Sequence, residues 1–180
     1  METAKLVKFD AILDEFPAYI VEPLAVLLDK KNNVKIRVHA RRDLIDMGKE
    51  ILPYIHLLLK SKNFTVRKEA VKITERIADK SSVLKLIDLL DDNESSIRWM
   101  AAEGLARIGR DSIVPLMKAI VKCGSSHYVK LGAHHVLSHV LTSEEKEKYK
   151  YLIHSLHDYF EINGSVKHEA SKALSNVYRA

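Results

Sequence analysis

A short pattern recurs five times along the chain at nearly constant spacing, and it limits the possible folds more than any other feature. Each copy has an aliphatic residue, then a basic residue, an alanine three positions later, and residues seven and ten positions later that are apolar except for Thr74 in the second copy. The basic residues lie 30, 31, 32 and 37 positions apart and are Arg37, Arg67, Arg98, Lys130 and Lys167. Units of this length bury their apolar faces against neighbouring units, so the pattern predicts a repeat array.

The apolar residues within each copy recur at the three, four and seven spacing of amphipathic helices, and no stretch alternates long enough to indicate a strand. A second apolar helix is predicted before each copy, at residues 20–28, 51–59, 83–90, 113–121 and 149–159. Three of these helices carry Pro23, Pro53 or Pro115 early, where a first turn accepts proline because the missing amide would be unpaired. We therefore expect an all-α superhelix of about five helical pairs, preceded by an N-terminal helix.

The repeats are predicted to form one domain over residues 1–180. A helix at 1–16 is expected to cap the exposed edge of the first repeat, because Leu6, Phe9, Ile12, Leu13 and Phe16 form one apolar stripe. The predicted repeats span residues 17–48, 49–79, 80–109, 110–141 and 142–180.

The repeat boundaries carry their own local signals. Gly48, Ala78 and Gly109 follow the patterned helices, and small residues suit a tight helix exit. The segment from Thr142 to Glu145 has the sequence of a capping box, which would open the first helix of the last repeat.

Composition narrows the class of protein. The single cysteine, Cys123, excludes an internal disulfide and favours a reducing compartment. The first residues lack the apolar core of a signal peptide, and no apolar run approaches the roughly 18 residues that cross a bilayer. We expect a cytoplasmic protein that does not contact a membrane. The net charge of +5 mildly favours an anionic partner.

The pattern, clearest from Ile97 to Gly109, resembles HEAT repeats and more narrowly the short subtype first associated with phycobilisome lyases. The resemblance covers about residues 18–180. It implies a HEAT-like solenoid of two layers, in which the second helix of each pair lines a concave groove. Members of this subtype include adaptors, bilin lyases and hydroxylases, so the resemblance predicts the fold better than the activity.

Positions one, five, nine and twelve after each recurring basic residue lie opposite the apolar stripe and should face this groove. Nine of these twenty residues are Lys or Arg and three are acidic, which concentrates positive charge there. The predicted binding residues are Arg42, Lys68, Lys72, Arg76, Trp99, Arg107, Arg110, His135, His139 and Lys172. They predict a protein–protein interaction scaffold with an acidic partner. The same groove could instead bind a nucleic-acid backbone, and bilin-lyase-like binding of a small ligand is the third alternative.

No catalytic or metal-binding residue is predicted, and we expect neither a cofactor nor an enzyme, with lyase and glycosylase activity as the alternatives. His168 and Glu169 resemble the iron-binding phrase of deoxyhypusine hydroxylase, but the other four repeats lack the matching pair. His135 and His139 have a metal-compatible spacing without an adjacent cysteine or carboxylate ligand. His134 falls on the inward face and is expected to lie in the core. The recurring basic residues are expected to bond carboxylates or carbonyls of the turns before them.

Overall fold

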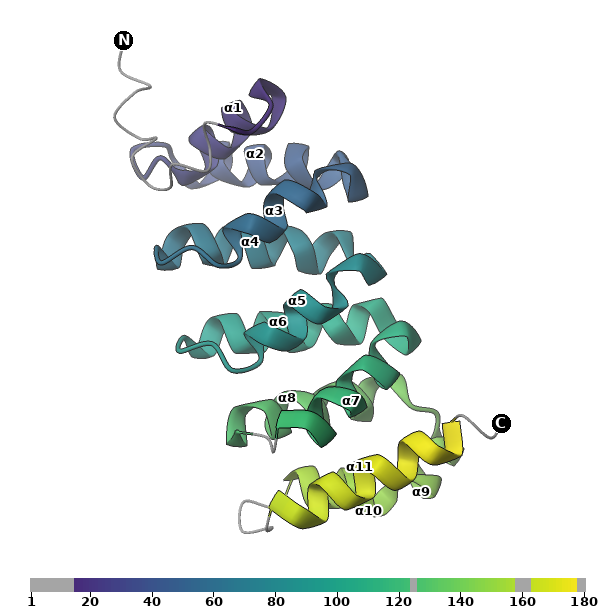
Figure 1. Cartoon of the computed structure of the whole chain (residues 1–180). Helices are drawn as coiled ribbons and strands as arrows, with labels where there is room; N and C mark the ends of the chain where they lie inside the picture. The colour runs from purple at the N-terminus through teal and green to yellow at the C-terminus, as the bar shows by residue number, and fades with distance from the viewer. Residues whose placement is uncertain (1–14, 124–125, 158–162, 178–180) are drawn as a thin grey trace. The chain divides into compact units, whose positions relative to one another are not determined.

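The computed structural model describes residues 15–123, 126–157 and 163–177, and every regular element in these ranges is an α-helix or a 3-10 helix (Figure 1). The chain divides into two compact units, Met1–Ile77 (unit 1) and Ala78–Ala180 (unit 2). The all-α fold predicted from the repeat pattern is confirmed.

Unit 1 consists of two helical pairs. α1 packs against α2, α3 packs against α4, and the second helices α2 and α4 also contact each other. Side chains such as Ile20, Leu44, Ile55 and Ile73 are fully buried between them. The elements are α1 (Ala18–Leu28), α2 (Val34–Asp46), η4 (Gly48–Ile51), α3 (Leu52–Leu58) and α4 (Phe64–Ile77).

Unit 2 repeats this arrangement: α5 packs against α6, and α7 packs against α8. The second helices α6 and α8 also contact each other. Its core includes Leu86, Ile97, Leu105 and Leu116, each with no exposed surface. The elements are η5 (Lys80–Ser82), α5 (Val83–Leu89), α6 (Ser95–Ile108), η6 (Gly109–Ser112), α7 (Ile113–Cys123), α8 (His127–Val140), α9 (Ser143–Lys148), α10 (Lys150–His157) and α11 (Asn163–Val177).

The recurring residues take the places that the pattern predicts. The patterned alanines are all buried, with exposures of 5%, 1%, 0%, 0% and 0% for Ala40, Ala70, Ala101, Ala133 and Ala170. Arg67 Nη1 donates to the Ser61 carbonyl at 2.7 Å, and Arg98 Nη1 donates to the Asp92 carbonyl at 2.7 Å. The basic residue therefore ties the second helix of these pairs to the turn before it.

The helix ends follow the predicted signals, with one exception. Gly48, Ala78 and Gly109 have φ angles of 68°, 51° and 78°, the left-handed conformation of a helix exit. Pro53 stands at the first turn of α3 as predicted. Pro23 instead lies inside α1, because this helix begins at Ala18, two residues earlier than expected.

The last pair departs from the predicted layers. We expected residues 149–159 in the layer of first helices and the final patterned helix along the groove. In the structure α10 packs against α8 and α11 packs against α7, so the two helices have exchanged layers (Figure 1). Val166, Ala170 and Ala173 are the buried residues that α11 offers to this packing.

The extra helix α9 precedes this exchange. The capping box is present, with Thr142 Oγ1 accepting from the Glu145 amide at 3.2 Å and Glu145 Oε2 accepting from the Thr142 amide at 3.0 Å. However, it opens the short α9, which ends at Lys148, and the following residue, Tyr149, has φ −106° and ψ 19°. The chain turns there and enters α10 on the side of α8. The prediction that this box opens the first helix of the last repeat was therefore wrong.

The predicted capping helix at 1–16 lies outside the described residues, apart from its last two positions. Phe16 is 7% exposed and packs edge-on against Tyr54, with ring centroids 5.2 Å apart. This contact places Phe16 against α3, within unit 1.

Candidate functional site

The predicted groove positions are exposed or half-buried wherever the structure describes them, so the inward and outward faces of the patterned helices are as expected. They fall into separate sets in the two units. Arg42, Lys68, Lys72 and Arg76 lie on α2 and α4 of unit 1. Trp99, Arg107, Arg110, His135 and His139 lie on α6, η6 and α8 of unit 2.

Lys172 does not join either set. It is exposed on α11, which lies in the layer of α7 rather than beside α8. The prediction that Lys172 lines the groove was therefore wrong, because it assumed that the fifth pair keeps the orientation of the first four.

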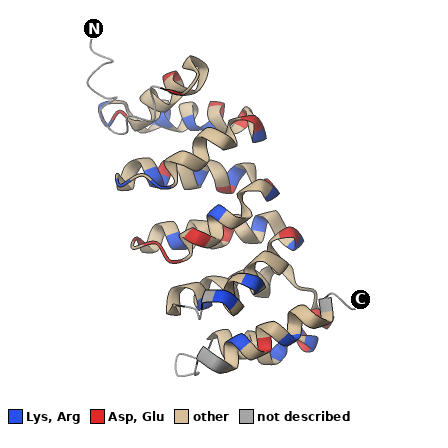
Figure 2. Ribbon diagram, in the orientation of Figure 1, with Lys and Arg blue, Asp and Glu red and all other residues tan. Residues whose placement is uncertain are grey.

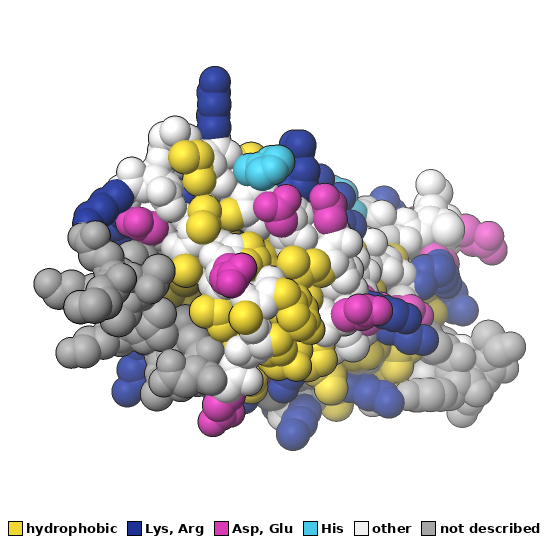
Figure 3. All heavy atoms as spheres, turned by 90° about the horizontal axis from the view of Figure 1, so that it is seen from above, with side chains coloured by type: hydrophobic (Ala, Val, Ile, Leu, Met, Phe, Trp, Pro, Cys, Tyr) yellow, Lys and Arg dark blue, Asp and Glu magenta, His cyan; other side chains and the backbone are white. Residues whose placement is uncertain are grey.

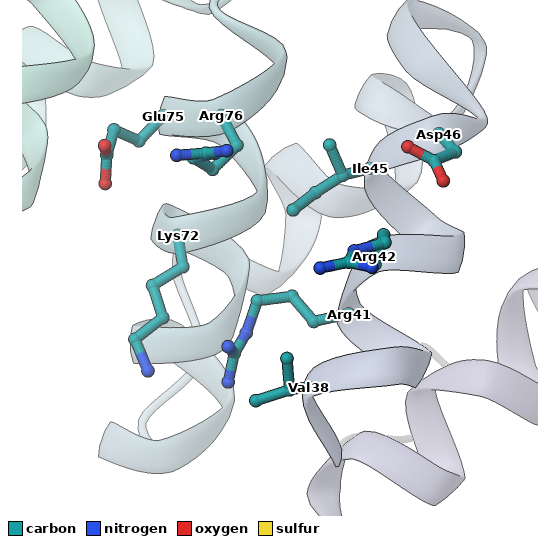
Figure 4. Close-up of a pocket in the computed structure, with 8 residues that line it drawn as sticks. All are labelled: Val38, Arg41, Arg42, Ile45, Asp46, Lys72, Glu75 and Arg76. Carbon is teal, nitrogen blue, oxygen red and sulfur yellow. The ribbon is translucent and has the colours of Figure 1, made fainter. Parts of the chain in front are cut away.

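A cleft of about 500 Å³ lies between the outward faces of α2 and α4 in unit 1, and basic side chains dominate its lining (Figure 4). Arg41 and Arg42 project from α2 toward α4, while Lys72 and Arg76 border the same space from α4. On the ribbons of these helices in Figure 2, positions of basic residues are interspersed with fewer acidic ones. We call this feature the basic cleft, and its lining residues are Val38, Arg41, Arg42, Ile45, Asp46, Lys72, Glu75 and Arg76.

Glu69 holds two of these cations in place. Arg41 Nε donates to Glu69 Oε2 at 2.6 Å, and Lys72 Nζ donates to Glu69 Oε1 at 2.9 Å. The Glu69 side chain is 12% exposed, so this carboxylate joins α2 to α4 from beneath the cleft. Arg42 and Arg76 are exposed and form no ion pair within the described part of the chain. The cleft therefore presents two exposed cations that form no ion pair in the described residues, although the carboxylates Asp46 and Glu75 also line it.

Lys68 lies one turn before Lys72 on α4, and its ammonium is 5.3 Å from the centre of the Phe64 ring. It does not line the basic cleft.

Arg41 was missed by the sequence analysis because it precedes the predicted groove position by one residue. The equivalent position holds the buried Val71 in α4 and the buried Ala102 in α6. An arginine at an otherwise inward position was the signal that could have identified it. In α2 this position faces α4, where Arg41 is half-buried and pairs with Glu69.

The end of unit 1 also exposes apolar side chains, which Figure 3 shows gathered among charged residues. Tyr19 and Val26 of α1 are 55% and 38% exposed, and Ile36 of α2 is 45% exposed. Pro23, Val26 and Ile36 line a shallow hollow between the two helices.

Unit 2 carries a different hollow on the face of α6 and α8, with a volume of about 520 Å³. Trp99 is 58% exposed, and its ring lies 4.7 Å from the His135 ring, which lies 4.1 Å from the His139 ring. Tyr128 packs its ring against the Arg98 guanidinium at 3.8 Å. We call this hollow the aromatic trough.

The orientation of His135 depends on both helices. Its Nε2 lies 2.8 Å from Glu103 Oε1, but the carboxylate oxygen is off the direction of the N–H bond, so the contact is electrostatic rather than a well-formed hydrogen bond. His139 Nδ1 lies 2.8 Å from the His135 carbonyl oxygen and donates to it in the corresponding tautomer. Three predicted residues, Trp99, His135 and His139, therefore do come together.

A second hollow, of about 650 Å³, adjoins the aromatic trough on the side of α9 and α10. Lys146, Lys150 and His154 line it, and His134, Ser138 and His157 line both hollows.

His134 was predicted to lie in the core, and this prediction was wrong. It is half-buried, and its ring lies 5.0 Å from that of His157 because α10 occupies the layer beside α8. Burial lowers the pKa of His134 below its ordinary value, and the neighbouring His157 and His135 lower it further.

The predicted groove residue Arg110 is engaged within its own unit. Its Nη1 and Nη2 donate to Glu145 Oε2 and Oε1 at 3.0 and 2.7 Å. The hydrogen bond from Arg110, with the backbone N–H of Thr142, lowers the pKa of Glu145 to about 2. Arg107 is exposed near the end of α6.

Two structural features were sought in the described residues and not found. No group of three or more His, Cys, Asp or Glu side chains is placed to hold a metal ion there. None of the described helices is both long and apolar enough to span a bilayer.

The comparison with known proteins follows the repeat pattern. No curated protein matches the chain. Residues 52–138 match the family model described as HEAT repeats, a match that does not confirm the phycobilisome-lyase-like subtype. HEAT repeats are generally non-catalytic and commonly mediate protein–protein interaction. The helical pairs of this chain are therefore similar to HEAT repeats, and the fold is an all-α, HEAT-like solenoid.

Proposed function

We propose that this chain is a non-catalytic interaction module that binds an acidic segment of a partner protein in the basic cleft. The observation that carries the proposal is the pair of exposed cations, Arg42 and Arg76, above a carboxylate that already holds Arg41 and Lys72. Complementary charge of this kind speeds encounter with an acidic partner and disfavours basic ones.

The apolar part of the cleft favours a protein partner over a nucleic-acid backbone. Val38 and Ile45 line the cleft among the cations, and Val38 is 41% exposed. A peptide that alternates acidic and aliphatic side chains can contact both kinds of residue. A phosphodiester backbone offers charge to the arginines but little apolar surface to Val38 and Ile45.

The test is a double charge reversal, Arg42→Glu with Arg76→Glu, assayed by fluorescence anisotropy with a labelled peptide of alternating Glu and Leu. Exposed charges contribute about 0–1 kcal/mol to stability, so the variant should remain folded. We expect peptide binding to weaken by at least roughly tenfold at low salt, with a smaller loss at high salt because counterions screen exposed charges.

The matched control is Lys60→Glu with Lys62→Glu, which changes the net charge equally on two exposed residues of the loop between α3 and α4. This control should leave peptide binding unchanged. Equal losses in both variants would assign the effect to net charge and refute the cleft. Tight binding of a single-stranded oligonucleotide, with no binding of the peptide, would instead support the nucleic-acid alternative.

A further inference from the structure

The two adjoining hollows of unit 2 share some lining residues, but the side chains at their far ends differ in chemistry. On the α6 side, Trp99 presents an exposed indole beside the His135 ring. On the α10 side, Lys146, Lys150 and His154 line the hollow. His134, Ser138 and His157 belong to both, so a single ligand lying across these residues would contact rings at one end and cations at the other.

The ring end suits a planar group. Trp99 and Tyr128 are 58% and 46% exposed, whereas aromatic side chains of this size usually bury most of their surface. Arg98 already directs its guanidinium to the Tyr128 ring and to turn carbonyls, so the ring end adds little free charge. Exposed aromatic rings of this kind stack on the planar bases of nucleotides.

The cationic end suits a phosphate. Lys146 and Lys150 stand four positions apart on successive short helices, and His154 follows on α10. Among the described residues that line this hollow there is no carboxylate, although Glu147 pairs with Lys150 at its edge. The Ser138 hydroxyl and the imidazoles of His134 and His157 add further hydrogen-bonding groups between the two ends.

We propose that these hollows together form a binding site for a ligand that joins an aromatic ring to a phosphate group. The volumes of about 520 and 650 Å³ are of the size that small-molecule sites occupy. Two sources share this chemistry, a free mononucleotide and a phosphotyrosine side chain. The site lies wholly in unit 2 and is independent of the basic cleft in unit 1.

Trp99 is the only tryptophan in the chain, so its fluorescence reports directly on the ring end. The probes are AMP and N-acetyl-phosphotyrosine amide, each compared with its unphosphorylated form, adenosine or N-acetyl-tyrosine amide. We expect at least one phosphorylated probe to change the Trp99 emission. Removing its phosphate should weaken binding about tenfold or more, because charge-assisted hydrogen bonds are lost. Binding of AMP alone assigns a nucleotide, and binding of the phosphotyrosine probe alone assigns a modified protein segment.

Two pairs of variants separate the ends of the site. Lys146→Gln with Lys150→Gln should weaken binding at least tenfold, whereas Lys118→Gln with Lys122→Gln should not. The control pair has the same spacing and charge on exposed residues of α7. Trp99→Leu should weaken binding measured by calorimetry, whereas Tyr19→Leu, at a 55% exposed aromatic residue of unit 1, should not.

Several results would overturn the proposal. One is the absence of any heat or emission change with either probe up to millimolar concentration. Another is unchanged binding in the Lys146 and Lys150 variant, after circular dichroism confirms its fold. A third is competition by inorganic phosphate as effective as that by AMP, which would show that the rings contribute nothing. The Arg42 and Arg76 reversal should leave probe binding intact, so the experiments test this site and the basic cleft independently.

Discussion

The basic cleft and the aromatic trough occupy the same kind of surface, the outward face of neighbouring second helices, yet their chemistry differs. Five positions after the recurring basic residue, unit 1 has Arg42 and Lys72, whereas unit 2 has Glu103 and His135. The repeat therefore determines which positions face outward, and the residues at those positions determine what each unit can bind. A repeat protein can thus hold two unrelated sites without any change in its packing.

The largest expected effect concerns the packing that both units share. Ala70→Leu in α4 and Ala101→Leu in α6 should each lower the free energy of unfolding by about 1–3 kcal/mol, because both alanines are at most 1% exposed. Ala18→Leu, at the exposed start of α1, should change it by less than about 0.5 kcal/mol. Chemical denaturation measures all three. An unchanged stability for Ala101→Leu would contradict the common repeat register. The comparison of equivalent positions in the two units would then fail as well.

The second prediction concerns the ion pair of unit 2 between Arg110 and Glu145, which lies in the first turn of α9. The pKa of Glu145 is lowered from 4.5 to about 2, first by the hydrogen bond from Arg110. Because the folded-state pKa lies below the unfolded one, this carboxylate stabilises the fold fully above pH 4.5, and its contribution is lost as the pH falls toward 2.

Arg110→Gln should raise the pKa of Glu145 toward 4.5, which an NMR titration of the side-chain carboxyl would measure. The Thr142 amide still donates to Glu145, so the return should be incomplete. A wild-type Glu145 that titrates near 4.5 would show that the Arg110 pair does not form in solution.

The third prediction tests the role of Glu69 beneath the basic cleft. Glu69→Gln frees Arg41 and Lys72 from their shared carboxylate, so affinity for the Glu–Leu peptide should rise up to about fivefold at low salt. Glu103→Gln removes the same charge beside His135 in unit 2 and should leave peptide affinity unchanged. A rise with both variants would mean that the peptide responds to net charge rather than to the cleft.

The smallest expected effect concerns His134, which lines both hollows of unit 2. The pKa of His134 is lowered from 6.5 by burial and then by His157 and His135. The neutral form is thus favoured in the folded state, so the stability that His134 contributes is complete above pH 6.5 and declines as the pH falls below it. His157→Gln should raise this pKa part of the way toward 6.5, as measured by imidazole NMR.

The matched control for this titration is His39→Gln, an exposed histidine on α2 of unit 1, which should leave the His134 pKa unchanged. A wild-type His134 that titrates at or above 6.5 would contradict the packing of α10 beside α8.

Much of the fold was predictable because it depends on local spacing. The burial of Ala101 and the bonds of Arg98 to its own turn involve residues within one helical pair, and the repeat pattern displays them directly. The site was only partly predictable. Arg42, Lys72 and Arg76 were identified by their position on the helix, but the pairing of Arg41 with Glu69 crosses between helices 28 residues apart.

The pattern of apolar and basic residues was sufficient to establish an all-α repeat, the inward and outward faces of its helices, and the excess of positive charge on the outward faces. These features follow from helical periodicity, which is a property of neighbouring residues. Only the tertiary structure decided that α10 lies beside α8, that His157 therefore meets His134, and that Arg110 pairs with Glu145 across 35 residues. The first two contacts depend on how the turn at Tyr149 directs α10, and the third depends on where α9 lies against η6. No periodic pattern encodes either.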